Sequence, residues 1–300
     1  MSILTNIPED WHAQVPNSQT FSKEHHLLGL NWNFQSDSFS FSVSFKPVSH
    51  PVTKRKVLSV ISKIYDPLGL ISPVIVQAKI FFQSLWCYQP SDDSASARLG
   101  WDDELPKSLM LKWHSVFHEL CSVSDVSIPR WVFHDPSATI EIHGFGDASS
   151  KAIAAAVYIR VITSDNVKST LLISKTKLAP VKTLVIPRLE LCASVLLAKL
   201  THHIIKVLAL ENYSVHLWSD SKDVLAWIGS SPHLWQTFVS HRIAEIQRLL
   251  PMAVWDHVEG KFNPADLASR GLNCQDLMNS SLWWNGPPFL VQSLLTWLDQ

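Results

Sequence analysis

Four carboxylates stand at comparable places in the secondary structure that the sequence predicts. They are Asp147 and Asp220 at the ends of two strands, Glu190 in the first turn of a long helix, and Asp266 at the start of the last helix. Strand ends and helix starts converge on one edge of an α/β sheet, so we expect the four side chains to gather there. Carboxylates that approach closely repel and raise one another's pKa unless a hard divalent cation neutralises them. The pattern therefore predicts a site for Mg²⁺ or Mn²⁺.

Two such ions about 3.5–4 Å apart can activate a water molecule and stabilise the leaving oxygen of a phosphodiester. The predicted chemistry is that of a nuclease with two ions. Each acid also has a structural explanation, because Asp220 could cap a helix at 221–229, Asp266 could be a first-turn acid and Asp147 a turn residue. The recurrence of four acids at one edge, each among nonpolar residues, favours the metal site.

The elements that must position these acids alternate between strand and helix after Pro129. Strands are predicted at 140–147, 152–161 and 170–174, joined as a meander, and the longest helix at 187–209 carries a continuous apolar stripe. A fourth strand ends at Ser219, and a fifth is predicted at 253–258. Helices are expected at 221–229, near 237–250 and from Pro264. The predicted order is βββαβααβα.

The first part of the chain has a different pattern. Phenylalanine and valine alternate with serine over 39–45, which indicates a half-buried strand and a β-hairpin turning at 35–38. Helices follow from residue 53, from 72 to 86, and near 106–121, where the acids at 102–104 are expected to cap the helix. The basic run at 54–56 could contact phosphate or could be a solvated helix start.

Composition narrows the function classes. The chain of 300 residues has 25 Lys and Arg against 26 Asp and Glu, so nucleic-acid contacts must be local and do not come from a basic coat. A hydrophobic content of 46% predicts a folded protein. The four cysteines never form a CxxC motif, which favours a reducing compartment. Neither a signal peptide nor a long apolar run is evident, so we expect a protein that is not secreted and has no membrane partner.

Four segments resemble the motifs of the ribonuclease H domain of BEL/Pao retrotransposons. They read GFGDAS (144–149), IPRLEL (186–191), WSDS (218–221) and NPADLASR (263–270). Upstream, KRKVLS (54–59) and YDPLGLISP (65–73) are similar to the segment between polymerase and nuclease in that family, and LGLNW (28–32) to the end of the reverse-transcriptase palm. Downstream, LWWNGPP (282–288) also looks like the family.

The resemblance implies the architecture. It predicts an α/β fold with a ribonuclease H-like mixed five-stranded sheet flanked by helices, preceded by a small, mostly helical thumb or connection module. The implied limits are 1–50 for a truncated palm end, 51–130 for the helical module, 131–275 for the ribonuclease H-like domain, and 276–300 for a tail toward an integrase region.

The resemblance also implies roles for individual residues. Asp147, Glu190, Asp220 and Asp266 become the metal-binding tetrad, which hydrolyses the RNA strand of an RNA–DNA hybrid. The implied hybrid contacts are Ser149, Arg188, Ser221, Lys222 and Asn263. Lys175, Lys177 and Lys182, between the third strand and the helix of Glu190, form a local basic patch that we expect to bind nucleic acid. The loop before the last acid lacks the histidine of bacterial relatives; the nearest is His257.

The sequence argues against two other activities, polymerase and peptidase, and leaves one rival to the nuclease. No Tyr-x-Asp-Asp run is present, so the chain cannot polymerise by itself, and the absence of an Asp-Thr/Ser-Gly triplet argues against a peptidase. The rival hypothesis is a non-catalytic retrotransposon remnant that binds nucleic acid or a protein. The implied partners are the RNA–DNA hybrid and the remaining polyprotein domains, the palm and the integrase. The expected location is the cytoplasm, in a retroelement particle, or the nucleus.

Overall fold

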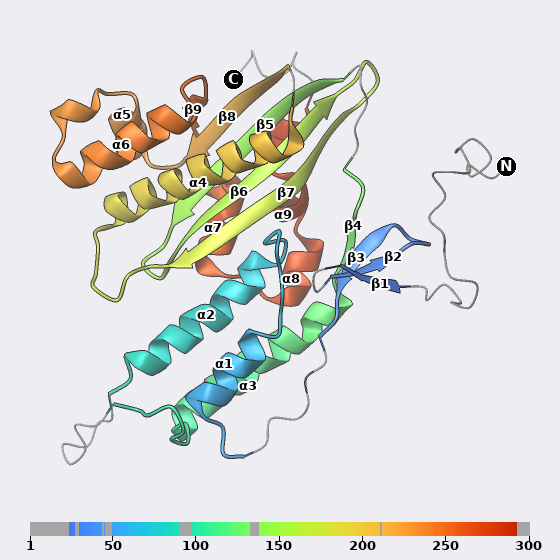
Figure 1. Ribbon diagram of the computed structural model, residues 1–300, viewed down its shortest axis with the longest axis vertical. Coiled ribbons are helices and arrows are strands. Elements are labelled where there is room, and N and C mark those ends of the chain that lie inside the picture. The colour runs from blue at the N-terminus through green and yellow to red at the C-terminus, as the bar shows by residue number, and fades with distance from the viewer. Residues whose placement is uncertain are drawn as a thin grey trace.

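A computed structural model describes residues 24–27, 30–43, 45, 50–89, 98–132, 138–210 and 212–292 (Figure 1). Residues 1–23 of the predicted palm end and 293–300 of the predicted tail lie outside this part. The first, antiparallel sheet has the order β1-β2-β3-β4. Its strands are β1 (Glu24–Leu27), β2 (Leu30–Asn33), β3 (Ser38–Phe41) and β4 (Ser127–Pro129). The predicted hairpin at 35–38 is confirmed, since β2 pairs with β3 across it.

Three helices separate β3 from β4 and form the predicted helical module. They are α1 (Lys54–Ile61), α2 (Ser72–Trp86) and α3 (Lys107–Ser122). The prediction that the acids at 102–104 cap α3 is wrong, because this helix follows Pro106 without a side-chain cap. Asp102 instead forms an ion pair with Arg55, and Asp103 accepts a hydrogen bond from the backbone N–H of Gly100.

The basic run at the start of α1 is also used inside the molecule. Lys54 is buried, its Nζ donates to the carbonyl of Leu99 at 2.6 Å, and it lies 4.4 Å from the ring centre of Trp86. The Lys56 ammonium donates to the carbonyl of Pro51. Lys54 is thus neither a solvated helix start nor an accessible phosphate contact.

The second sheet is mixed and has the order β7-β6-β5-β8-β9. Its strands are β5 (Thr139–Ala148), β6 (Ala152–Ile162), β7 (Val167–Leu178), β8 (Tyr213–Ser219) and β9 (Val254–His257). The first three are antiparallel, whereas β8 runs parallel to β5 and β9 parallel to β8. The predicted fold class, a mixed five-stranded sheet flanked by helices, is confirmed, together with the predicted order of elements.

Helices cover both faces of this sheet. Helix α4 (Ile186–Leu208), with α5 (Lys222–Ile228) and α6 (Thr237–Leu249), lies on one face, and α7 (Pro264–Arg270) lies on the other (Figure 1). By length and composition α4 could cross a membrane, but 50% of its apolar window is buried inside the molecule. It packs against β5, β6 and α6 as a core helix.

One hydrophobic core joins the helical module to the sheet. The cluster around Phe145 and Tyr158 of the sheet continues without interruption to Val74 of α2 and Trp113 of α3. A second cluster fills the space between the sheet and α4 with α6. The helical module is therefore not a separately packed appendage of the sheet.

The C-terminal segment is a wedge between these two parts. It comprises α8 (Cys274–Asn279), α9 (Ser281–Asn285) and the residues up to 292. Trp283 is fully buried; its Nε1 donates to the carbonyl of Leu70, and its own carbonyl accepts from the hydroxyl of Tyr158, both at 2.8 Å. The described part of the predicted tail thus belongs to the packed body. The limits predicted for the four domains remain a prediction.

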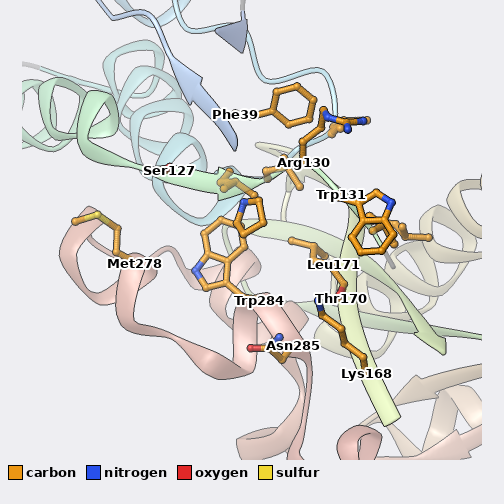
Figure 2. A pocket seen from close by; sticks show the side chains of 16 residues that line it. Phe39, Ser127, Arg130, Trp131, Lys168, Thr170, Leu171, Met278, Trp284 and Asn285 are labelled. Carbon is orange, nitrogen blue, oxygen red and sulfur yellow. The ribbon is translucent and has the colours of Figure 1, made fainter. Parts of the chain in front are cut away.

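A cavity of about 330 Å³ lies where the first sheet, β7 and this wedge meet. Figure 2 shows Phe39 and Arg130 from the side of the first sheet, Lys168 and Leu171 from β7, and Trp284 from the wedge. None of the four predicted metal ligands lines this cavity. It is separate from the carboxylate edge.

A buried polar network fastens the wedge to the sheet. Arg160 is fully buried; its Nη1 donates to Glu141 at 2.7 Å, and its other nitrogens donate to the carbonyls of Leu290 and Gln292. His143 accepts at Nδ1 from Trp218, so its proton sits on Nε2, which lies 3.0 Å from Glu141. Burial opposes the charge of Glu141, but the hydrogen bonds from His143 and Arg160 outweigh it and hold the pKa of its carboxyl at about 2.

Replacing Glu141 tests this network. Because Arg160 would keep a buried charge without its partner, we expect Glu141→Gln to lower the free energy of unfolding at pH 7 by about 3–5 kcal/mol, measured by urea denaturation. The folded pKa lies below the unfolded value of 4.5, so the stabilisation by the carboxylate is complete above pH 4.5 and is lost as the pH falls toward 2. The variant should lack this acid-sensitive component.

The matched control is Glu259→Gln, which removes an exposed ion pair with Lys261. It should leave the urea midpoint unchanged. A Glu141→Gln protein as stable as the wild type, with the same acid dependence, would contradict the structural role of the network.

Candidate active site

The pairing of β5 with β8 brings two of the predicted acids together. The strands are parallel and Gly146 lies opposite Ser219, so Asp147 and Asp220 are neighbours at the same sheet edge. Oxygen atoms of Asp147, Glu190 and Asp220 lie within 4.8 Å of one another. The predicted convergence is confirmed for these three, although Glu190 lies just after the first turn of α4 rather than within it.

Helix α4 reaches the site because a glycine lets it approach the sheet. A Cβ on Gly144 would lie 2.6 Å from Leu217 Cδ2 and 2.7 Å from Leu197 Cδ1. A larger residue would require the buried side chains of Leu217 and Leu197 to move. Glycine at 144 therefore favours the close packing of α4 on β5, the strand that carries Asp147.

Helix α7 is bonded directly to β5. The side chain of Asn263 donates to the carbonyl of Gly146 at 3.0 Å and accepts from the backbone N–H of Ala265, which caps α7. One helical turn later, the Ser269 hydroxyl donates to Asp147 Oδ2. Asn263 is fully buried. The prediction that its side chain contacts the hybrid is therefore wrong, because the side chain has no access to a ligand and instead anchors α7 to β5.

Asp266 stands apart from the compact group. It lies in the first turn of α7, as predicted, but its side chain is 29% exposed and accepts a hydrogen bond from Arg270 Nε. It does not belong to the trio whose oxygens lie within 4.8 Å. Its charge nevertheless helps to raise the pKa of Asp147. The fourth predicted ligand is at the rim of the site, held by Arg270.

The three clustered carboxylates are electrostatically strained. Burial, followed by the charges of Asp220 and Asp266, raises the pKa of Asp147 to about 6 against the hydrogen bond from Ser269. Burial and the neighbouring Asp147 and Asp220 raise the pKa of Glu190 to about 9. Burial also raises the pKa of Asp220. Each carboxylate resists ionisation in its present surroundings.

Two of their oxygens are buried without a hydrogen-bond partner in the described part of the chain. These are Glu190 Oε2 and Asp220 Oδ1. Buried polar atoms are normally satisfied, and carboxylate oxygens are the ligands that Mg²⁺ and Mn²⁺ prefer. The donor set therefore fits divalent cations.

The predicted lysine patch lies to one side of this cluster. Lys175 and Lys177 are exposed on β7, the edge strand two positions from β5 in the sheet order. Lys182 is exposed in the connection that leads to α4. All three are accessible, and their contact with nucleic acid stays a prediction.

The other residues predicted to contact the hybrid differ in their exposure and in their contacts within the protein. Arg188 is exposed in the first turn of α4, with its guanidinium carbon 5.1 Å from the ring centre of Phe238. Ser221 caps α5, and Lys222 follows it in an exposed position. Ser149 is half-buried and its hydroxyl donates to the carbonyl of Ser269. Their role in binding also stays a prediction.

The sequence predicted no role for two residues that contact the acids, Ser269 and Arg270. Ser269 and Arg270 follow Asp266 by three and four residues, which places all three side chains on one face of a helix. The spacing in the sequence could therefore have predicted that Ser269 and Arg270 lie beside Asp266. His257, at the end of β9, is close enough to Asp220 for its charge to lower the pKa of that carboxyl.

The fold and the carboxylate edge together define a ribonuclease H-like α/β protein. The family model for the Pao retrotransposon-like RNaseH-like domain matches residues 53–221, more than half of the chain. The chain belongs to this family. No curated protein gives a significant match.

Solved structures similar to the chain include two cellular RNases H. The N-terminal RNase H domain of a Mycobacterium tuberculosis protein is 17% identical, with 48% of this chain and 95% of that one covered and a TM-score of 0.31. RNase H1 of Halobacterium salinarum is 14% identical, with 42% and 90% covered and a TM-score of 0.28. A foamy viral protease–reverse transcriptase in complex with RNA/DNA hybrid is 12% identical over 79% of this chain and 29% of that one, with a TM-score of 0.42.

Replacing Glu190 with its neutral amide tests the metal site. In EDTA at pH 8 we expect Glu190→Gln to melt above the wild type, because the folded pKa of about 9 exceeds the unfolded value of 4.5 and ionisation destabilises the fold as the pH rises between them. Mn²⁺ at about 100 times its dissociation constant should stabilise the wild type by about 2.7 kcal/mol. The variant should lose much of this gain.

Thermal denaturation with and without Mn²⁺ measures both effects. Glu245→Gln is the control, since it removes only the surface pair with Lys199 and should keep the full response to Mn²⁺. An equal Mn²⁺ response in wild type and Glu190→Gln would rule out Glu190 as a ligand.

Proposed function

We propose that the chain hydrolyses the RNA strand of RNA–DNA hybrids by two-metal phosphodiester hydrolysis. The observation that carries the proposal is a trio of carboxylates, two buried and one half-buried, whose oxygens lie within 4.8 Å at one edge of a ribonuclease H-like sheet. Two of the three, Glu190 and Asp220, have a buried oxygen without a hydrogen-bond partner among the described residues. Two Mg²⁺ or Mn²⁺ ions held there would supply an activated water and stabilise the leaving oxygen. Membership in the Pao retrotransposon-like RNaseH-like family supports the same reaction class.

Each residue has a distinct part in this proposal. Asp147, Glu190 and Asp220 would hold the metal ions, and Asp266 would complete the set from the rim. Ser269 fixes the orientation of the Asp147 carboxylate through Oδ2. A hybrid is distinguished from DNA by the 2′-hydroxyls in its wide, shallow minor groove, which the exposed basic residues around the edge would approach.

We also propose that the chain acts beside the other parts of a retroelement polyprotein. The partners would be a reverse-transcriptase palm and an integrase, within the domain limits given above, and the place a cytoplasmic retroelement particle or the nucleus. The family match is what supports this setting.

Cleavage of a labelled hybrid tests the nuclease. With Mg²⁺ or Mn²⁺, the wild type should cut the RNA strand, whereas Asp147→Asn should lose about 10³-fold or more in rate, because a lost ligand removes several kcal/mol of transition-state stabilisation. Asp256→Asn, an exposed acid on β9, is the matched control and should retain activity.

A folded wild-type protein that binds the hybrid but does not cut it in Mn²⁺ would contradict the nuclease. That result would favour the rival hypothesis of a non-catalytic binding remnant. Cleavage that survives in Asp147→Asn would instead contradict the assignment of the site.

Ser269→Ala tests the positioning of Asp147. The hydrogen bond from Ser269 lowers the pKa of this carboxyl, so its loss should raise the pKa by about one unit. The acid limb of the pH–rate profile should move to higher pH by the same amount, with partial recovery of the rate above pH 8. Ser230→Ala, at a hydroxyl outside the carboxylate trio, should leave the profile unchanged.

A further inference from the structure

A cavity of about 580 Å³ lies beside the free edge of the five-stranded sheet, between the two halves of the molecule. One wall is the 61–79 stretch of α1, its following loop and α2, another is β7 around residues 173–176, and a third is α4 at Leu200 and His203. It holds none of the four carboxylates of the candidate active site. The helical module and the ribonuclease H-like sheet both contribute to it.

Two lysines from different halves face this cavity. Lys79 on α2 is half-buried, and Lys175 on β7 is exposed. Burial lowers the pKa of Lys79 and the charge of Lys175 lowers it further, whereas Asp66 opposes both, so the two ammonium groups are close enough to repel. Within the described residues neither lysine forms a hydrogen bond or an ion pair.

The cavity offers little negative charge to offset these lysines. Asp66 is its one acidic residue, and both carboxylate oxygens already accept backbone N–H groups, from Leu70 and Ile71 at 2.9 Å. Thr176 lines the same wall, is 8% exposed and has a buried hydroxyl without a hydrogen-bond partner among the described residues. The wall therefore combines two lysines, one of them attracted only at longer range by Asp66, with an unused hydroxyl.

The backbone adds a further donor. The N–H of Ser174 points away from the sheet and donates to the carbonyl of Leu68, so by strand alternation the N–H of Thr176 points to the same side. Such a set of donors suits a tetrahedral anion with several acceptor oxygens.

We propose that this cavity binds a backbone phosphate of the nucleic-acid substrate through Lys79, Lys175 and Thr176. The inference rests on the proposed function and adds the helical module to the substrate-binding surface. Thr176 lies opposite Ala154, which lies opposite Asp147, so the backbone of Thr176 is two strand spacings, about 10 Å, from that of Asp147. Lys177 and Lys182 continue the positive charge toward the start of α4.

The size of the cavity and the extent of the positive charge around it favour a polynucleotide over a free phosphate as the ligand. The cavity is much larger than one phosphate, and Ile173 and Leu200 give it apolar walls that a sugar can contact. The positive charge also extends beyond the cavity instead of ending in it. A nucleic-acid strand that follows the β7 edge would meet these lysines before it reached Asp147 and Glu190.

The test is binding of a fluorescent RNA–DNA hybrid, measured by anisotropy at several salt concentrations in the full chain. The Asp147→Asn background prevents cleavage, so binding is measured whether or not the chain is a nuclease. Lys79→Gln should weaken binding about 3–10-fold and reduce the slope of log K against log salt by about one. Lys79→Arg should restore both values.

Lys63→Gln is the matched control, since Lys63 is exposed in the same stretch but does not line the cavity, and it should change nothing. Lys175→Gln, on the exposed edge strand, gives a second variant whose fold is not at risk and should act like Lys79→Gln. Unchanged affinity and salt slope in both variants would overturn the proposal.

Competition by inorganic phosphate distinguishes a cavity that binds a backbone phosphate of nucleic acid from one that binds only free phosphate. Millimolar phosphate should compete with the hybrid in the wild-type cavity and not in Lys79→Gln. If phosphate shifts the NMR signals of the cavity residues but Lys79→Gln binds the hybrid as well as its parent, the assignment to a polynucleotide is overturned. Binding that depends on Lys79 in the Asp147→Asn background, together with a protein that retains Asp147 and does not cut the hybrid in Mn²⁺, would count against the nuclease alone.

Discussion

Repulsion between two buried carboxylates and a third, half-buried one is the constraint on which the rest of this fold depends. Asp147, Glu190 and Asp220 sit at a protein edge where burial alone already disfavours their charges. Such groups stay together only if the surrounding structure is rigid enough to prevent them from separating. The parallel pairing of β5 with β8, the close approach of α4 at Gly144 and the bond from Asn263 to Gly146 each remove one route by which the site could relax.

The same rigidity explains why the core extends beyond the nuclease sheet. The face that carries α7 is covered by the helical module and the C-terminal wedge, with Trp283 bonded to both sides. Arg160, which is fully buried, draws the wedge onto β6 through two backbone carbonyls. Without these contacts the α7 face would expose a large apolar surface, and α7 would lose the support that holds Ser269 against Asp147.

The local sequence pattern was sufficient to predict the helices and strands and most of the residues of the candidate site. Alternation over β5 to β7 and the long apolar stripe of α4 are direct consequences of strand and helix periodicity, and parallel strands that end together explain why Asp147 and Asp220 could be paired from the sequence. Hydrogen-bond partners that are distant in the sequence could not be predicted from local pattern. Asn263 looked like a polar loop residue, but its amide bonds to Gly146, 117 residues earlier in the chain.

Charge pattern was the least reliable guide. Lys54 stands at a polar helix start, yet Trp86 and the carbonyl of Leu99 enclose its ammonium group, and only the tertiary structure brings these groups together. Asp102 was expected at a helix cap and instead pairs with Arg55, 47 residues away. Helix-start rules consider one helix at a time, whereas both residues are determined by contacts between α1 and the loop before α3.

The shared core has a further consequence for how substrate contacts are distributed. Because α2 packs against β7 and α7, a basic side chain on α2 keeps a fixed position relative to the carboxylates on β5 and α4. Lys79 lacks an ion pair among the described residues, and the attraction of Asp66 offsets only part of the cost of burying its charge. An unpaired charge that destabilises the free protein lowers the energetic penalty of binding an anion, since the repulsion is relieved in the complex. The same argument applies to the carboxylate trio and a divalent cation. The helical module thus contributes positive charge beside β7, and the sheet contributes the carboxylates at the ends of β5 and β8.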